Sequence, residues 1–156
     1  MRSKNQGGFS LIELLIVVTI IGIIASIAIP NLLASRRAAN EGSAQSSMRT
    51  ISSCEATYQH TYGNGTYTDL TSLGSSTLTD SVLSTGQKSG YSFVFTPTAG
   101  PPAQYWGYAI PTITSGIGQT GTRRFAIAED GVLRGDIILT APADEAAVMA
   151  ISPMGN

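Results

Sequence analysis

Apolar residues are concentrated at the start of the chain, where residues 14–29 form an almost continuous hydrophobic run. Counted from Phe9, the run to Ile29 comprises 21 residues. As an α-helix rising 1.5 Å per residue, it would extend about 31 Å and match the hydrocarbon core of a bilayer. We therefore expect residues 9–29 to form a membrane-spanning helix.

The helical pattern continues after Pro30 but becomes amphipathic. Apolar residues recur at three- and four-residue steps near one face of the predicted helix: Leu33, Ala44, Met48, Ile51, Cys54, Tyr58 and Tyr62. Four charged residues leave that face and are interpreted as solvated surface, with subunit contacts as the alternative: Arg36, Arg37, Glu41 and Arg49. Gly63-Asn64-Gly65 then supplies a stop signal, so the helix is expected to end near Tyr62.

Short segments with β-strand character follow the helix: Tyr91–Phe95, Tyr105–Ile110, Phe125–Glu129 and Val132–Arg134. The last two flank Asp130-Gly131, a pair suited to the two-residue type I′ turn of a hairpin. Before them, residues 66–89 are rich in Ser, Thr and Gly and predict a connecting loop with a short helix near residues 78–83.

Successive short strands with short links favour an antiparallel sheet, one face of which can bury the apolar face of the helix. We expect an α+β fold, in which a long N-terminal helix has a protruding hydrophobic half and an amphipathic half packed on about four strands. Residues 30–156 would then form one globular domain. Beyond Asp136 the pattern assigns nothing: Ile137–Leu139 fits a strand extension and Asp144–Ile151 fits a short helix.

Charge at the N-terminus predicts the orientation in the membrane. Arg2 and Lys4 precede the apolar run without an acidic neighbour, so the positive-inside rule places the N-terminus in the cytoplasm and the C-terminal domain outside. The competing interpretation is an ordinary secretory signal peptide cut after Ala28. Two features disfavour it: the run exceeds the usual signal core of about 7 to 15 residues, and Glu13 has no purpose in such a signal.

The sequence GGFSLIELL at residues 7–15 resembles the processing motif of type IV prepilins. The resemblance implies that a prepilin peptidase cuts between Gly8 and Phe9, removes residues 1–8 as a leader, and methylates the new amine of Phe9. It also implies that Glu13 is required for assembly of the subunits into a filament. The similarity is dense from residue 7 to about residue 37 and thins out afterwards.

Elementary electrostatics agrees with these implied roles. Cleavage would create a positive amine on Phe9 one helical turn from Glu13, and each charge alone in hydrocarbon is costly. The amine of an incoming subunit could therefore pair with Glu13 of a subunit already in the filament and fix the axial register. Gly22 and Pro30, which also match the family pattern, weaken the helix and predict a segment that can bend between them.

The composition excludes several classes of function. Charged residues make up 12% of the chain and the net charge is −1, so no basic field for nucleic acid exists. His60 is the only histidine, Cys54 the only cysteine, and no glycine-rich phosphate loop occurs, so neither an enzyme nor a cofactor is expected. The acids near the C-terminus lack EF-hand spacing, so no metal site is predicted, although some related secretion pseudopilins bind calcium.

Three functions remain open. The favoured one is a structural subunit of a bacterial type IV pilus, held in the inner membrane before the pilus assembly machinery polymerises it through its N-terminal helix into a surface filament for adhesion or motility. The second is a pseudopilin of a type II secretion system, and the third is a minor tip pilin that binds DNA or a surface. A tip pilin would favour an inserted loop or an exposed basic or aromatic patch, and none is evident.

Overall fold

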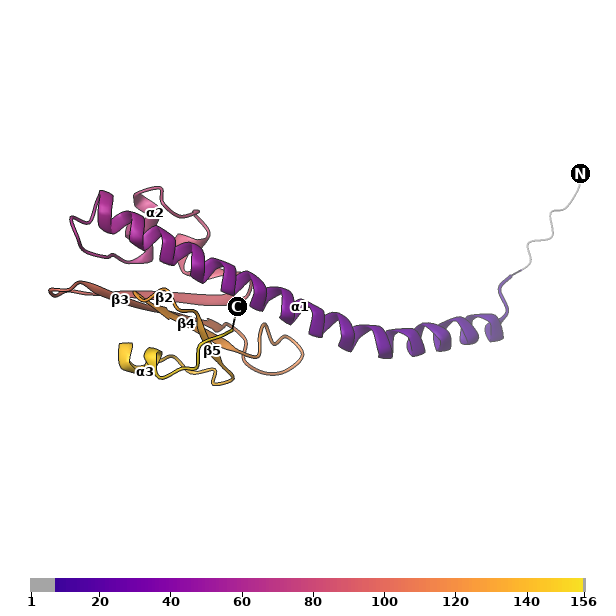
Figure 1. Ribbon diagram of the computed structural model, residues 1–156. Helices are drawn as coiled ribbons and strands as arrows, with labels where there is room; N and C mark the ends of the chain where they lie inside the picture. Colours follow the sequence, from indigo (N-terminus) through magenta and orange to yellow (C-terminus); the bar gives the residue numbers. More distant parts are fainter. Residues whose placement is uncertain (1–7, 156) are drawn as a thin grey trace, which may run out of the picture. The chain divides into compact units, whose positions relative to one another are not determined.

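The computed structural model describes residues 8–155, and the chain divides into a compact unit up to Ser35 and a larger one from Arg36 onwards. The long helix α1 (Leu11–Thr61) is continuous through both (Figure 1). Most of the predicted leader, including Arg2 and Lys4, lies outside the described residues. The membrane orientation that depends on these two residues therefore stays a prediction.

Pro30 lies inside α1, where its ring nitrogen cannot donate to the carbonyl of Ser26 one turn earlier. Gly22 has no atom within 4 Å of the position that a Cβ would take. The helix assignment nevertheless runs unbroken through both positions. The predicted bend between Gly22 and Pro30 stays a prediction.

An antiparallel sheet of five strands in the order β1-β2-β3-β4-β5 forms the centre of the larger unit. The strands are β1 (Gln87–Lys88), β2 (Tyr91–Thr98), β3 (Gln104–Pro111), β4 (Arg124–Ala128) and β5 (Arg134–Asp136). The α+β prediction is therefore confirmed, with one strand more than the four expected. The additional strand β1 is only two residues long, and it pairs with the first two residues of β2.

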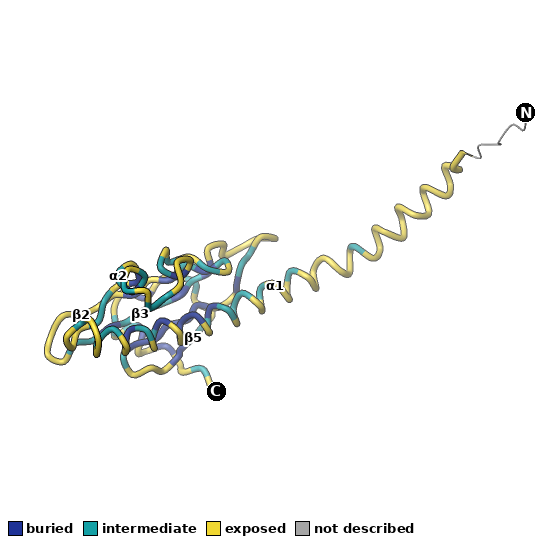
Figure 2. The backbone as a smooth tube through the Cα atoms, turned by 90° about the horizontal axis from the view of Figure 1, so that it is seen from above, coloured by how far each residue is buried: buried dark blue, intermediate teal, exposed yellow. Residues whose placement is uncertain are grey.

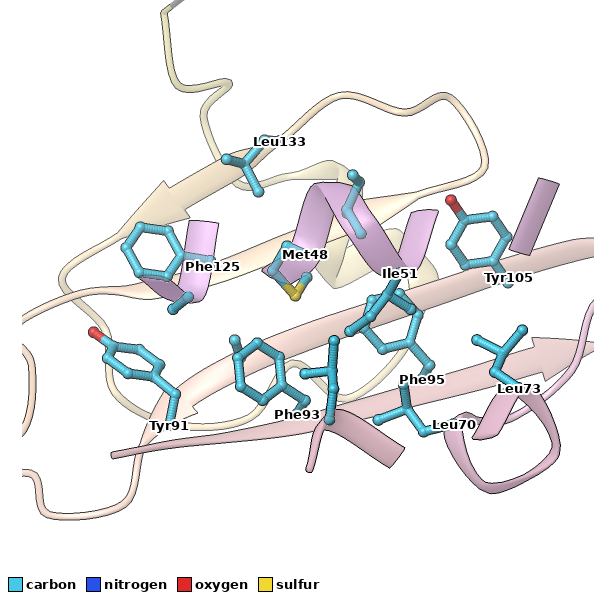
Figure 3. Close-up of a cluster of buried hydrophobic side chains, with 14 residues drawn as sticks. Met48, Ile51, Leu70, Leu73, Tyr91, Phe93, Phe95, Tyr105, Phe125 and Leu133 are labelled. Atoms are coloured by element: carbon cyan, nitrogen blue, oxygen red, sulfur yellow. The ribbon is translucent and has the colours of Figure 1, made fainter. Parts of the chain in front are cut away.

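The part of α1 from Arg36 onwards lies along one face of this sheet and fills the core with the residues of its predicted apolar face (Figure 3). Ala44, Met48 and Ile51 are fully buried. They meet the large side chains that alternate inward along β2, at residues 91, 93 and 95. Tyr62, predicted on this face, is 62% exposed, because the helix ends at Thr61.

Both faces of β4 are covered, which is why all five of its residues are buried. Phe125 and Ile127 face α1, whereas Ala126 and Ala128 pack against the short helix α3 (Glu145–Met149). Asp144 caps α3 by accepting a 2.8 Å hydrogen bond from the N–H of Ala147. The short helix that the C-terminal pattern allowed is therefore present, and it forms a third layer.

The turn at Asp130-Gly131 differs from the predicted two-residue hairpin. Strand β5 begins at Arg134 rather than Val132, so five residues separate it from β4, and only Gly131 has a positive φ, at 68°. The Asp130 carboxylate accepts from the N–H of Val132 and from the guanidinium of Arg134. These bonds stabilise a wider turn than the type I′ turn, which needs positive φ at both central residues.

The connection from α1 to the sheet also differs from expectation. Its helix is α2 (Leu70–Ser75), not residues 78–83, and a 3₁₀ turn η1 (Leu83–Thr85) follows. Asp69 starts α2 by accepting a 2.8 Å hydrogen bond from the N–H of Ser72. Leu70 and Leu73 are buried, so this segment covers part of the core instead of forming only a surface loop.

Arg124 in β4 binds both the end of β5 and the chain after it, where no disulfide is present. The Arg124 guanidinium donates to both carboxylate oxygens of Asp136, at 2.7 and 2.8 Å, and to the carbonyl of Thr140 at 2.6 Å. The Arg124 side chain is 10% exposed, so water screens this pair little. Near the C-terminus, the N–H of Met154 donates to the carbonyl of Leu133 at 2.9 Å.

Arg124→Met is expected to lower the free energy of unfolding by about 2 kcal/mol, because it leaves the Asp136 carboxylate and the Thr140 carbonyl without their donor. Chemical denaturation of the full chain in detergent measures the change. Lys88→Met is the matched control: the Lys88–Asp80 pair, 3.0 Å long, is far more exposed, so water screens it and its loss should change the free energy of unfolding much less. Equal effects of the two changes would contradict a clamping role for Arg124.

Candidate processing and assembly site

The predicted cleavage point between Gly8 and Phe9 lies in exposed chain just before a helix. Phe9 is 90% exposed, and neither residue belongs to a secondary-structure element, since α1 begins at Leu11. Peptide bonds inside a helix are tied into its backbone hydrogen bonds, whereas the Gly8–Phe9 bond lies ahead of the first turn. A peptidase could reach this bond without first unwinding α1.

Glu13 closes the first turn of α1 through a hydrogen bond to the backbone. Its Oε2 accepts from the N–H of Ser10 at 2.8 Å, and Leu14 donates to the carbonyl of Ser10 at 3.3 Å. Ser10 immediately precedes the helix and Glu13 stands three positions later, which is the spacing of a capping box. The carboxylate is thereby held at the N-terminal end of the helix, where the helix dipole favours negative charge.

The hydroxyls in the apolar part of α1 find partners within the helix. Its large apolar side chains are about half exposed or more, from Val17 at 49% to Leu11 at 82%. The hydroxyls of Thr19 and Ser26 donate hydrogen bonds to backbone carbonyls of the same helix, at 2.8 and 2.7 Å. This arrangement suits hydrocarbon, where every polar group must find an internal partner.

Among the described residues, α1 is the helix that is long and apolar enough to cross a membrane, with a mean hydropathy of 2.8 in its most apolar window. None of that window is buried against the protein, unlike the core helix of a soluble protein. Figure 2 shows the exposed stretch in yellow, ahead of the buried part of the same helix. A signal sequence near the N-terminus can reach the same hydropathy, but the length of this run and the acid at Glu13 disfavour that interpretation.

The predicted site residues therefore fall into two groups. Phe9 and Glu13 lie together at the start of α1, with Gly8 just before them. Gly22 and Pro30 lie further along the helix and make no site with them. Sequence reasoning missed the role of Ser10, although the Ser10-x-x-Glu13 spacing is a readable helix-start signal.

Glu55 is a buried acid that the sequence did not single out. It is fully buried on the face of α1 that meets the sheet; its Oε2 accepts from the N–H of Thr68 at 3.1 Å, and its Oε1 has no partner among the described residues. Burial, reinforced by the charge of Asp69, raises the pKa of this carboxyl to about 7. No basic side chain forms an ion pair with it within the described residues.

The remaining acids and the lone thiol have structural partners. Asp130 and Asp136 pair with arginines, and hydrogen bonds from Arg134 lower the pKa of Asp130. Across residues 8–155, no three His, Cys, Asp or Glu side chains gather in a way that could hold a metal ion. The Cys54 thiol donates to the carbonyl of Leu78 at 2.8 Å, and burial raises its pKa.

Comparison with known proteins points to the same segment. The model of the prokaryotic N-terminal methylation motif matches residues 3–29. The chain is 60% identical over 38 residues to the type IV wide pilus major component PilA4 of Thermus thermophilus, a match that covers 24% of this chain and 29% of that protein. It is 39% identical over 46 residues to the type II secretion system core protein G of Aeromonas hydrophila, covering 30% of this chain and 32% of that one.

These matches span about a third of the length of the curated relatives. They confirm the resemblance that residues 7–15 carried. No solved structure matches the chain.

Proposed function

We propose that this chain is a structural subunit of a bacterial type IV pilus. The proposal is supported by the similarity of its N-terminal segment to those of type IV pilins and pseudopilins. A prepilin peptidase removes residues 1–8 and methylates the amine of Phe9. The subunit waits in the inner membrane, with its N-terminus in the cytoplasm and residues 9–29 in the bilayer. The assembly machinery then polymerises it into a helical surface filament.

The observation that carries this proposal is the start of α1. An exposed Gly8–Phe9 bond precedes a helix whose first turn holds a carboxylate, and an exposed apolar face follows it. Processing would turn this arrangement into an amine and a carboxylate on one apolar helix. The cost of placing each charge in hydrocarbon favours their pairing, and pairing between neighbouring subunits would fix the axial register.

A pseudopilin of a type II secretion system is the second candidate, favoured by the similarity to core protein G. The greater identity to a pilus major component supports the pilus. Both candidates use the same processing and the same helix. They differ in where the assembled protein is found and in how much of it is made.

The test is the intact mass of the protein in material sheared from the cell surface and in the membrane fraction. We expect the mass of residues 9–156 plus one methyl group, abundant in sheared filaments. The same mass confined to the membrane fraction would favour the pseudopilin. A chain beginning at Ile29 would overturn both and leave the signal-peptide interpretation.

A further inference from the structure

The loop between β3 and β4, residues 112–123, is fastened to the first turns of α1 in the larger unit. Gln119 accepts from the Arg37 guanidinium at 3.0 Å, and the carbonyl of Thr120 accepts from the Asn40 amide at 2.9 Å. Thr122 donates both its N–H and its hydroxyl to Glu41 Oε1, each at 2.7 Å. Three successive contacts thus fix the loop at the point where the chain enters this unit.

The loop is ordered by its own hydrogen bonds and carries exposed isoleucines. The N–H of Thr120 donates to the carbonyl of Ile113 at 3.0 Å, and Gln119 donates to the carbonyl of Thr114 at 3.2 Å. Ile113 is 47% exposed and Ile117 is 83% exposed. A braced loop that holds large apolar side chains in water gains free energy from any surface that covers them.

Arginines stand at the end of this loop and at the start of α1 in the larger unit. Arg36 and Arg123 are exposed, and neither forms an ion pair within the described residues, whereas Arg37 is hydrogen-bonded to Gln119 of the loop. The acid on this side is Glu41, whose Oε1 is occupied by Thr122. Exposed isoleucines beside guanidinium groups form the combination by which proteins bind an anionic bilayer surface.

The helix to which this loop is hydrogen-bonded, α1, is continuous with the apolar segment. Leu32, 68% exposed, extends the apolar run beyond Ile29, and Arg36 follows four residues later, about 6 Å along a helix. The headgroup layer on each side of a bilayer is about 5 to 8 Å thick. If residues 9–29 span the membrane, Arg36 lies seven residues beyond Ile29, about 10 Å along a helix, and its long side chain can reach back to the lipid headgroups.

We propose that residues 112–123, with Arg36 and Arg123, form a lipid-binding surface that holds the globular unit against the outer, anionic face of the membrane before assembly. This rests on the proposed function, because it needs the helix in the bilayer. Ile113 and Ile117 enter the interface, while the guanidinium groups bind lipid phosphates. Extraction into the filament would have to release these contacts.

The test uses the full chain with Cys54→Ser, reconstituted into vesicles that contain 30% phosphatidylglycerol or phosphatidylcholine alone. An environment-sensitive dye is placed at Ile117→Cys, at Tyr62→Cys as a control that is also well exposed, or at Ile20→Cys inside the apolar segment. Spin-labelled lipids, with the label near the headgroup or deep in the acyl chains, quench the dye according to its depth.

We expect headgroup-level quenching at residue 117 to exceed that at residue 62 several-fold in the anionic vesicles. Arg36→Gln with Arg123→Gln, or vesicles of phosphatidylcholine alone, should reduce this difference by about fivefold or more. Quenching at residue 117 no stronger than at residue 62, while residue 20 is quenched deeply, overturns this proposal and leaves the membrane anchor standing. Absence of deep quenching at residue 20 contradicts the anchor itself. If the dye at residue 117 is shielded from water in sheared filaments but not in vesicles, the lipid-binding proposal is overturned and a contact between subunits is favoured.

Discussion

Glu13→Leu is expected to abolish filament assembly while cleavage after Gly8 proceeds nearly as before. In the proposed filament the amine of Phe9 enters hydrocarbon and pairs with Glu13 of a neighbouring subunit. Without the carboxylate the amine stays unpaired, which costs about 3 to 5 kcal/mol for a buried charge. Since 1.4 kcal/mol corresponds to a factor of ten, we expect filament yield to fall by about a hundredfold or more.

Glu13→Gln separates the charge of this residue from its role in the capping box. The side-chain oxygen of the introduced glutamine can still accept from the Ser10 N–H, as the Glu13 carboxylate does at 2.8 Å, but the amide carries no charge. If pairing with the amine drives assembly, this variant should fail almost as completely as Glu13→Leu. If the cap alone matters, it should assemble normally.

The measurement is the ratio of sheared filament protein to total processed protein, with the mass of the processed chain as the readout of cleavage. Full-length filaments from Glu13→Leu cells would refute the pairing. A loss of cleavage in either variant would assign Glu13 to recognition by the peptidase instead. Ser10→Ala is the matched control, because it keeps both the Glu13 charge and the backbone N–H that Glu13 accepts from.

The parts of the fold that the sequence predicted are those with strong periodicity. The apolar face at Ala44, Met48 and Ile51 recurs with the period of a helix, so both the helix and its buried side were readable. Strand β2 alternates large apolar residues with smaller ones, and its inward side chains are the ones buried. A repeated local pattern fixes both the element and its inner face.

The features that the sequence missed depend on single side-chain contacts that no periodic pattern indicates. The Asp130-Gly131 pair fits a tight turn locally, but the ion pair of Asp130 with Arg134 widens it. Helix α2 depends on a single cap at Asp69, in a stretch where Ser and Thr carry little periodic signal. In the candidate site, Glu13 was recognised because an acid is unusual at the start of an apolar run. Its partner Ser10 was missed because a serine before a helix is common.

Glu55 was overlooked because a charged residue on a helix is ordinarily exposed, and no local pattern indicates that the segment around Thr68 covers it. Because Glu55 is buried, the free energy of unfolding falls as the pH rises, whereas a salt-bridged acid would make it rise. The groups that face it are Asp69, Tyr105 and Cys54, and none supplies a positive charge. The proton is therefore the only neutralising partner for this carboxyl among the described residues.

Glu55→Gln is expected to stabilise the chain at pH 8 by on the order of 3 kcal/mol and to change it little at pH 5. The pKa of Glu55 is about 7 in the folded chain against an ordinary value of 4.5, so between these values the folded state holds a proton that the unfolded state has released. Stability conferred by the protonated group is thus fully present below about pH 4.5 and is lost as the pH rises through 7. Glutamine keeps an acceptor for Thr68 without a charge.

Urea denaturation of the full-length variant and the parent in detergent, at pH 5 and pH 8, measures the difference, and the comparison between the two pH values is its own control. A stabilisation of equal size at both would show that the substitution acts through packing rather than charge. A destabilisation at pH 8 would mean that the carboxylate has a partner in solution. The expected result is a gain in the free energy of unfolding that is confined to high pH. It would show that burying the ionised Glu55 carboxylate between α1 and the segments packed on it destabilises the folded chain above its pKa.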